Sequence, residues 1–230
     1  MKVLVIGGTG FIGTAIVAKL IKDLTFQVTI LSRNTKKVRD LYQDRVAAVS
    51  GDITDLASLE SLNWNYDAVI QCAQFPNAPV QDYKKGYTYE KFDAEGTENV
   101  CRVIKAKGPE VKRIVYFSGA GVTPEKTQPW FRAKARAEKA VKETGKDFVI
   151  LRPSWVFGPG DRSMNKFITM AKFLPVMPVI GDGKSRVSPI FIDDLAEVAV
   201  RALKLEHVKN RVFEFGGPKV MTMNEIQKAV

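Results

Sequence analysis

The sequence has few of the residues that form disulfide scaffolds, zinc sites or hydrolytic triads. It contains two cysteines, Cys72 and Cys101, with no CxxC pair, and one histidine, His207, in the polar stretch LEHVKN. Disulfide frameworks and zinc sites need closely spaced groups of such residues, so we expect no metal site. Serine–histidine or cysteine–histidine catalysis would depend on His207 alone, which we expect at the surface.

Long apolar runs are also absent. No apolar stretch approaches the length of a membrane span, and the opening MKVLVIGG is too short for the apolar core of a signal peptide. With 45% hydrophobic and 26% charged residues, the 230-residue chain has the composition of a globular protein. We therefore expect a cytoplasmic protein without a membrane span.

The net charge of +10 is not concentrated in one block. Basic residues alternate with acids along helix-like stretches such as RAKARAEKAVKETGK, and no basic block is interleaved with aromatics. This pattern is typical of solvated helix faces. A nucleic-acid partner is therefore not favoured, whereas an anionic ligand remains compatible with the charge.

What the chain does have is a regular alternation of strand-like and helix-like stretches. Apolar runs predict strands at 2–7, 27–32, 45–52, 67–73, 113–119, 147–153 and 211–217, and helical patterns cover 11–24, 35–42, 54–62, 88–106 and 129–145. Strands that are apolar along their whole length are buried on both faces. The alternation predicts an α/β protein with a doubly wound, Rossmann-type parallel sheet of about seven strands.

The pattern loosens after Gly158, where glycine and proline become frequent. We expect a dinucleotide-binding domain over 1–157 and a small C-terminal α/β lobe over 158–230, interleaved with the sheet. A loop and helix are expected from GPGDRSMNKF, and Asp194 with Glu197 forms a candidate capping box. The last ten residues, MTMNEIQKAV, begin a helix on which the chain stops; a truncated lobe is one interpretation.

The stretch GGTGFIG directly follows the first predicted strand and opens the first helix. Gly7 allows a tight turn, Gly10 lets the backbone approach a pyrophosphate, and Gly13 lets the helix pack closely on the strand. Thr9, Phe11 and Ile12 lie in the same loop. We expect these residues to bind a dinucleotide cofactor.

The end of the second predicted strand favours NADP over NAD. An NAD site would place an acid there to hold the ribose hydroxyls, but this chain has Ser32, Arg33 and Asn34, followed by Lys36 and Lys37. A guanidinium can grip a 2′-phosphate that a carboxylate would repel. We expect Arg33 to contact this phosphate, with help from Ser32 and the lysines.

Further cofactor contacts are expected after the other strands. In GDITD, Asp52 could accept from the adenine amine while Ile53 packs on the ring; a helix cap is the competing role for Asp55. The remaining candidates follow the fourth, fifth and sixth predicted strands or end them: Cys72, Ala73, Gln74, Ser118, Pro153, Ser154 and Trp155.

Six stretches of the sequence together resemble the extended short-chain dehydrogenase/reductase superfamily, also described as NAD-dependent epimerase/dehydratase-like. They are GGTGFIG, GDITD, FDAEGTENV, RIVYFSGAGV, ILRPSWVFGPGDR and SPIFIDDLAEVAVRAL. The resemblance covers nearly the whole chain. The run from LRPSWVFGPGDRSMNKF to FEFGGP is most similar to the atypical branch of the 39 kDa accessory subunit of respiratory complex I and its prokaryotic relatives.

The resemblance implies a catalytic serine and a YxxxK pair, in which the tyrosine transfers a proton and the lysine binds the nicotinamide ribose. In WFRAK, Lys134 matches the lysine, but Trp130 replaces the tyrosine. The serine position falls near Ala120, with Ser118 two residues earlier. Since an indole N–H does not ionise usefully, Lys134 and Ser118 are the catalytic candidates that remain. Lys134 could instead be an ordinary surface lysine, interchangeable with Lys139 or Lys142.

The resemblance also bears on substrate. Epimerases of the superfamily hold a sugar-nucleotide diphosphate with an asparagine where this chain has Trp155, so a nucleotide sugar is not expected. Trp130, Trp155 and Phe157 suggest a more apolar pocket, although core packing explains Phe157 equally well. Two hypotheses follow. In the first, the protein binds NADP and has a structural, assembly or redox-sensing role with a protein partner. In the second, it is an NADPH-dependent reductase or isomerase acting on a small apolar carbonyl or quinone, with Ser118 or a tyrosine of QDYKKGYTYE as proton donor.

Overall fold

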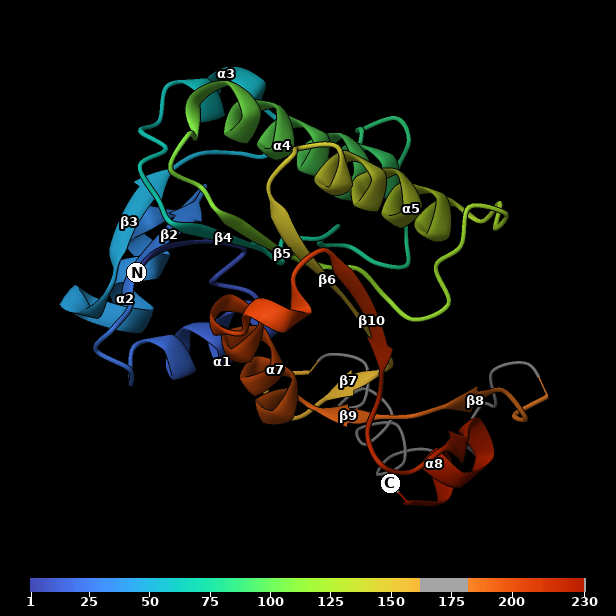
Figure 1. Ribbon diagram of the computed structural model, residues 1–230. Helices are drawn as coiled ribbons and strands as arrows, with labels where there is room; N and C mark the ends of the chain where they lie inside the picture. Colours follow the sequence, from blue (N-terminus) through green and yellow to red (C-terminus); the bar gives the residue numbers. More distant parts are fainter. Residues whose placement is uncertain (162–181, 230) are drawn as a thin grey trace.

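The computed structural model describes residues 1–161 and 182–229 (Figure 1). Its main sheet has seven strands in the order β10-β6-β5-β4-β1-β2-β3, and every neighbouring pair is parallel. The predicted doubly wound parallel sheet is confirmed. The strands are β1 (Lys2–Ile6), β2 (Gln27–Ser32), β3 (Ala47–Ser50), β4 (Ala68–Gln71), β5 (Arg113–Phe117), β6 (Asp147–Pro153) and β10 (Arg211–Phe215).

Helices cover both faces of this sheet (Figure 1). One face carries α1 (Phe11–Leu20), α2 (Thr35–Tyr42) and α7 (Ile192–Lys204); the other carries α3 (Leu56–Glu60), α4 (Gly96–Lys107) and α5 (Pro129–Lys142). In β1, Val3 and Val5 belong to the first core while Leu4 and Ile6 belong to the second. Because successive strand residues point to opposite faces, a strand between two helical layers must be apolar throughout.

Several predicted elements end earlier than their apolar patterns. The strand predicted over 45–52 occupies Ala47–Ser50, that over 67–73 occupies Ala68–Gln71, and α1 ends at Leu20. The helix predicted over 88–106 begins as η2 (Glu90–Glu95), a π-helical turn that runs directly into α4. Short 3-10 turns, η1 (Gln43–Arg45) and η3 (Glu206–Val208), complete the connections.

Beyond Gly158 the described chain returns to the main sheet. β10 pairs with β6, and the apolar face of α7 lies in the same core as α1. The remaining elements are β7 (Val156–Phe157), paired with β9 (Ile190–Phe191), β8 (Arg186–Val187), paired with β11 (Met221–Thr222), and α8 (Met223–Ala229). The expected boundary at 157/158 stays a proposal. Most of the helix expected from GPGDRSMNKF lies outside the described residues.

The predicted capping box at Asp194 is wrong. α7 begins at Ile192, directly after β9, and its N-cap residue Phe191 makes no side-chain cap. Asp194 is therefore the third residue of the helix, where it is exposed and complements the positive end of the helix dipole. Over the described ranges, no helix has the length and apolar character needed to cross a bilayer.

Candidate functional site

The predicted cofactor residues gather at one edge of the sheet. Because all seven strands are parallel, the residues that end or follow them share the carboxyl edge (Figure 1). Ligands of doubly wound sheets bind at this edge, where the strand order reverses, here between β1 and β4. The predicted residues at this edge are the loop 7–13, Ser32, Arg33, Asn34, Asp52, Ile53, Cys72, Ala73, Gln74, Ser118, Pro153, Ser154 and Trp155.

The glycine loop has the geometry of a phosphate cradle. Gly7 has φ +92°, and a Cβ there would lie 2.6 Å from the amide nitrogen of Ala73. A Cβ on Gly13 would lie 2.1 Å from the Gly7 carbonyl oxygen, so α1 can approach the loop only with glycine at this position. Gly10 is the N-cap of α1 and has no side-chain cap. The first amides of α1 are therefore available to an anion, and the loop fits a dinucleotide pyrophosphate.

Two contacts that the sequence patterns did not reveal anchor this loop. The buried Tyr42 hydroxyl donates to the carbonyl oxygen of Gly8 at 2.6 Å, and burial raises its pKa to about 12. The Lys37 ammonium donates to the carbonyl oxygen of Thr9 at 3.1 Å. Lys37, expected near the 2′-phosphate, is thus engaged with the loop in this structure.

The end of β2 carries no acid. The Ser32 hydroxyl accepts from the Asn34 amide at 3.1 Å, and the Asn34 side chain caps α2 by accepting from the Lys37 amide. The Arg33 side chain is 57% exposed, and its guanidinium lies 3.7 Å from the Asp52 carboxylate. An exposed pair of this kind contributes at most about 1 kcal/mol, so Arg33 can turn toward an anionic ligand.

After β3, the side chains have local roles. The Ile53 side chain is 7% exposed and lies within 2.8 Å of the position a Cβ on Gly96 would occupy. In this structure it belongs to the core, so its predicted contact with an adenine ring stays a prediction. Asp55 caps α3 by accepting from the amides of Ala57 and Ser58, as its alternative role predicted.

Cys72 follows β4 and is buried, with its thiol 3.1 Å from the carbonyl oxygen of Ile6. Burial raises its pKa to about 12, so the thiol stays protonated at neutral pH and is no nucleophile. Ala73 and Gln74 continue this turn and are half-buried. Cys101 is buried in α4, and burial raises its pKa to about 12 as well.

Lys134 lies deep inside the protein. Its ammonium donates to the carbonyl oxygen of Phe117 at 3.1 Å and lies 2.9 Å from the Asp93 carboxylate. Lys134 is 0% exposed, whereas the Lys139 side chain is 75% exposed, so the alternative of an interchangeable surface lysine is wrong. In this structure the ammonium is thus engaged by groups of the protein, and its predicted contact with the nicotinamide ribose stays a prediction.

Asp93 is a site residue that the sequence patterns did not single out. It is 1% exposed, and its second carboxylate oxygen accepts from the Phe75 amide at 3.0 Å. The residue sits in the π-helical turn η2, a feature that is rare and often found at functional sites. The only available signal was its place in FDAEGTENV, one of the stretches that carry the family resemblance.

Ser118, a predicted catalytic residue, belongs to a buried ionic cluster. Its hydroxyl donates to Glu138 at 2.6 Å, and Glu138 also accepts two hydrogen bonds from Arg152, at 2.8 and 2.7 Å. Glu138 is 3% exposed, so this carboxylate depends on these partners. The hydroxyl of Ser118 is thus committed to a carboxylate on α5 in this structure.

Trp130 occupies the surface of the turn that follows β5. A Cβ on Gly119 would lie 2.4 Å from the indole, so only glycine allows this close approach. The neighbouring ring of Phe131 packs edge-on against Trp130, with ring centroids 4.7 Å apart. Neither ring can supply a proton.

The tyrosines of the chain differ in their access to this region. Tyr116 is in the core, and burial raises its pKa well above 10. In the loop before η2, Tyr83 is 71% exposed and Tyr87 is 42% exposed. Tyr89 is half-buried and packs edge-on against Phe75, with ring centroids 4.9 Å apart. Burial, and secondarily the charge of Asp93, raise the pKa of Tyr89.

The residues at the end of β6 connect the sheet to the following segment. The Pro153 carbonyl accepts from the Ala120 amide at 3.0 Å, and the Ser154 hydroxyl accepts from the Ser188 amide at 3.1 Å. The Trp155 carbonyl accepts from the Ile190 amide at 2.9 Å. The ring of Phe157 packs against that of Phe191, with centroids 5.6 Å apart.

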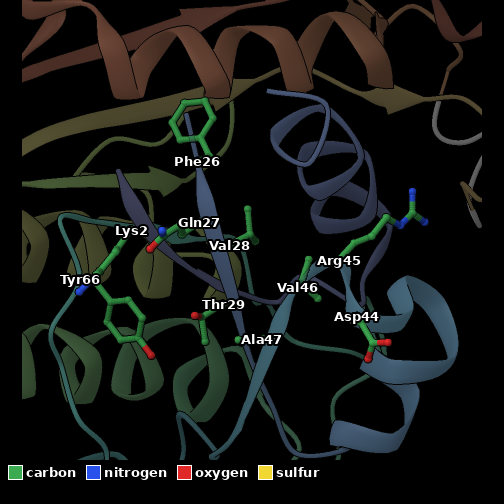
Figure 2. A pocket seen from close by; sticks show the side chains of 10 residues that line it. All are labelled: Lys2, Phe26, Gln27, Val28, Thr29, Asp44, Arg45, Val46, Ala47 and Tyr66. Carbon is green, nitrogen blue, oxygen red and sulfur yellow. The ribbon is translucent and has the colours of Figure 1, made fainter. Parts of the chain in front are cut away.

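A hollow of about 450 Å³ lies at the opposite edge of the sheet (Figure 2). Its walls include the first residues of β1, β2 and β3 together with Tyr66. It is separated from the glycine loop by the full length of the strands, so it is distinct from the predicted cofactor site. No group of three or more histidine, cysteine, aspartate or glutamate side chains in the described part of the chain could hold a metal ion.

A family model, the NAD dependent epimerase/dehydratase family, matches residues 3–216. The chain therefore belongs to this family. A solved structure of UDP-glucuronic acid 4-epimerase from Bacillus cereus in complex with UDP-glucuronic acid and NAD has the same fold, with a TM-score of 0.83 and 21% identity over 99% of this chain and 82% of that one.

The curated relatives confirm the expected branch. The chain is 29% identical to NADH dehydrogenase [ubiquinone] 1 alpha subcomplex subunit 9, mitochondrial, from Arabidopsis thaliana, over 96% of this chain and 55% of the relative. It is 28% identical to the 2-alkyl-3-oxoalkanoate reductase of Stenotrophomonas maltophilia, over 85% of this chain and 63% of the relative. It is also 28% identical to the photosystem II assembly factor Ycf39 of Synechocystis, over 98% of this chain and 65% of the relative. The chain thus spans about half to two thirds of their lengths. Because the first of these relatives is mitochondrial by name, the cytoplasmic location stays a prediction.

Proposed function

We propose that this protein binds NADP in preference to NAD and has a structural, assembly or redox-sensing role. The proposal depends on one observation: the glycine loop has the geometry of a phosphate cradle, while a tryptophan occupies the position of the family's catalytic tyrosine. The loop closed by Gly7 and Gly13 fits a pyrophosphate, while Trp130 stands four residues before the buried Lys134. Such a site can hold a dinucleotide but lacks the phenol of the family pattern.

The charge at the end of β2 supports NADP. Arg33 is largely exposed, and no carboxylate is present among residues 32–34 to repel a 2′-phosphate. Asp52 lies beside Arg33 but is also held by the amide and hydroxyl of Thr54. A bound phosphate could therefore replace the weak Arg33–Asp52 contact without leaving Asp52 unpaired.

The names of the relatives support the assembly role. One is a complex I subunit and another is an assembly factor for photosystem II. By analogy, we propose a protein partner in a large assembly for this chain. The analogy is made at the level of the family branch, since each relative is longer than this chain.

Titration with NADP and NAD tests the cofactor assignment. The wild type is expected to bind NADP more tightly, and Arg33→Ala should lose roughly ten- to a hundredfold in NADP affinity, the usual worth of charge-assisted bonds to phosphate. Arg39→Ala, which removes an exposed arginine farther along α2, is the matched control. Equal affinity of the wild type for NADP and NAD would refute the assignment.

The second candidate function is an NADPH-dependent reductase. It is favoured by the resemblance to 2-alkyl-3-oxoalkanoate reductase and by the half-buried Tyr89, one helical turn before Asp93. The cofactor would supply hydride to a carbonyl carbon, and the Tyr89 hydroxyl would supply the proton to its oxygen. NADPH oxidation with a panel of apolar carbonyls and quinones tests this function. Activity that falls in Tyr89→Phe but persists in Tyr83→Phe would establish it.

A further inference from the structure

The buried pair of Asp93 and Lys134 has an unusual electrostatic setting. The two side chains are 1% and 0% exposed, and their charged atoms lie 2.9 Å apart. Each makes one further bond to the backbone, to Phe75 and Phe117 respectively. Ionised groups with so little contact with water interact over longer distances than surface charges, because the surrounding dielectric is low and salt screens them poorly.

The pair lies at the carboxyl edge of the sheet, close to its reversal point. Phe117 ends β5, and Phe75 lies in the turn that follows β4. The same turn approaches the glycine loop, since a Cβ on Gly7 would touch Ala73. The charge of Lys134 also acts on Cys72, where it lowers the thiol pKa against the larger effect of burial. The pair therefore lies within electrostatic reach of the crevice between β1 and β4.

A dinucleotide changes its charge in such a crevice when its redox state changes. The nicotinamide ring carries one positive charge when oxidised and none when reduced. A lysine alone would disfavour the oxidised ring, whereas a lysine paired with a carboxylate presents almost no net charge. Asp93 thus decides whether the buried groups distinguish the two redox forms.

We propose that Asp93 determines the relative affinity of this protein for oxidised and reduced dinucleotide, by neutralising Lys134. The proposal rests on the proposed dinucleotide binding and adds a specificity-determining residue to it. With the pair intact, the two buried charges contribute almost equally to the binding of the oxidised and of the reduced dinucleotide. A protein in this state responds to the ratio of the two forms and is not saturated by one of them.

The test is the ratio of the dissociation constants for NADP⁺ and NADPH, measured by calorimetry. Asp93→Asn keeps an oxygen for the Phe75 amide but leaves Lys134 unneutralised, so the ratio should shift toward NADPH by roughly three- to tenfold, the size expected for one charge in a partly buried site. The control is Asp67→Asn, whose carboxylate binds the Lys2 amide at the opposite edge of the sheet. It should leave the ratio unchanged.

The double variant Asp93→Asn/Lys134→Gln separates charge from packing. It restores a neutral pair, so the ratio should return to the wild-type value even if both affinities fall. If Asp93→Asn does not fold, Lys134→Gln tests the same point with opposite sign, because the remaining carboxylate favours NADP⁺. An unchanged ratio in the folded single variants would overturn the proposal. Absence of binding by the wild type to either form would instead refute the proposed function.

Discussion

Replacement of Glu138 tests whether the Ser118 cluster is structural. Glu138→Gln removes a charge that receives one hydrogen bond from Ser118 and two from Arg152. Breaking a buried ion pair typically costs about 3–5 kcal/mol. Here the Arg152 side chain remains 19% exposed and Glu214 lies 3.8 Å away as a second partner, so we expect a loss of about 2–3 kcal/mol in the free energy of unfolding.

Urea unfolding followed by circular dichroism measures this change as a lower midpoint with an unaltered slope. In a thermal scan, the same loss corresponds to a decrease of roughly 4–12 °C in Tm for a chain of this size. The matched control is Glu197→Gln, a 44% exposed carboxylate that pairs with Arg201 and should change stability by less than about 0.5 kcal/mol. If the two variants unfold at the same urea concentration, the cluster is not a stabilising element.

Three further outcomes are expected. Gly13→Ala should abolish dinucleotide binding and destabilise the protein, because its Cβ would collide with the Gly7 carbonyl, whereas Gly145→Ala, at a positive φ in open space, should leave binding intact in a titration. Cys72 and Cys101 should resist thiolate-directed alkylation in the native state at pH 8 and react in urea. Since burial raises both pKa values from 9.0 to about 12, their contribution to stability should be complete below pH 9 and be lost as the pH rises toward 12. Trp130→Tyr, which returns a phenol to the family position, should gain NADPH-dependent carbonyl reduction in a spectrophotometric assay. If the variant is folded and binds NADPH but shows no gain, the tryptophan in place of the family tyrosine is not what limits catalysis.

The sequence was most informative where one physical requirement decides the residue type. β2, β6 and α2 occupy the predicted residues, because their apolar runs or caps have unambiguous ends. The glycine loop was equally readable, since its spacing reflects steric limits that Gly7 and Gly13 satisfy. Strands followed by further apolar or small residues, such as Cys72 and Ala73 after β4, were predicted too long.

The contact partners of the charged residues could not be predicted from the sequence pattern. Lys134 and Lys139 look alike in an amphipathic helix, and only the packing of α5 against η2 buries one of them beside Asp93. The π-helical turn also changes which residues of the segment 88–106 face the sheet, which no regular helical period predicts. The hydrogen bond of Ser118 was unreadable for a related reason, because its partner Glu138 is twenty residues away and on another element; the catalytic role of Ser118 stays a prediction.

The position of α7 and β10 has a consequence for how this chain folds. Arg113, at the start of β5, donates to the carbonyl oxygens of Ala202, Leu203 and Leu205 at the end of α7, and α7 shares a core with the first helix of the chain. During synthesis, α1 and the outer edge of β6 therefore stay incompletely covered until α7 and β10, residues 192–215, have left the ribosome. Contacts between such distant segments slow folding and leave apolar surface open to aggregation. A chain interrupted before residue 192 would keep its entire phosphate cradle and still lack the helix that shares a core with α1.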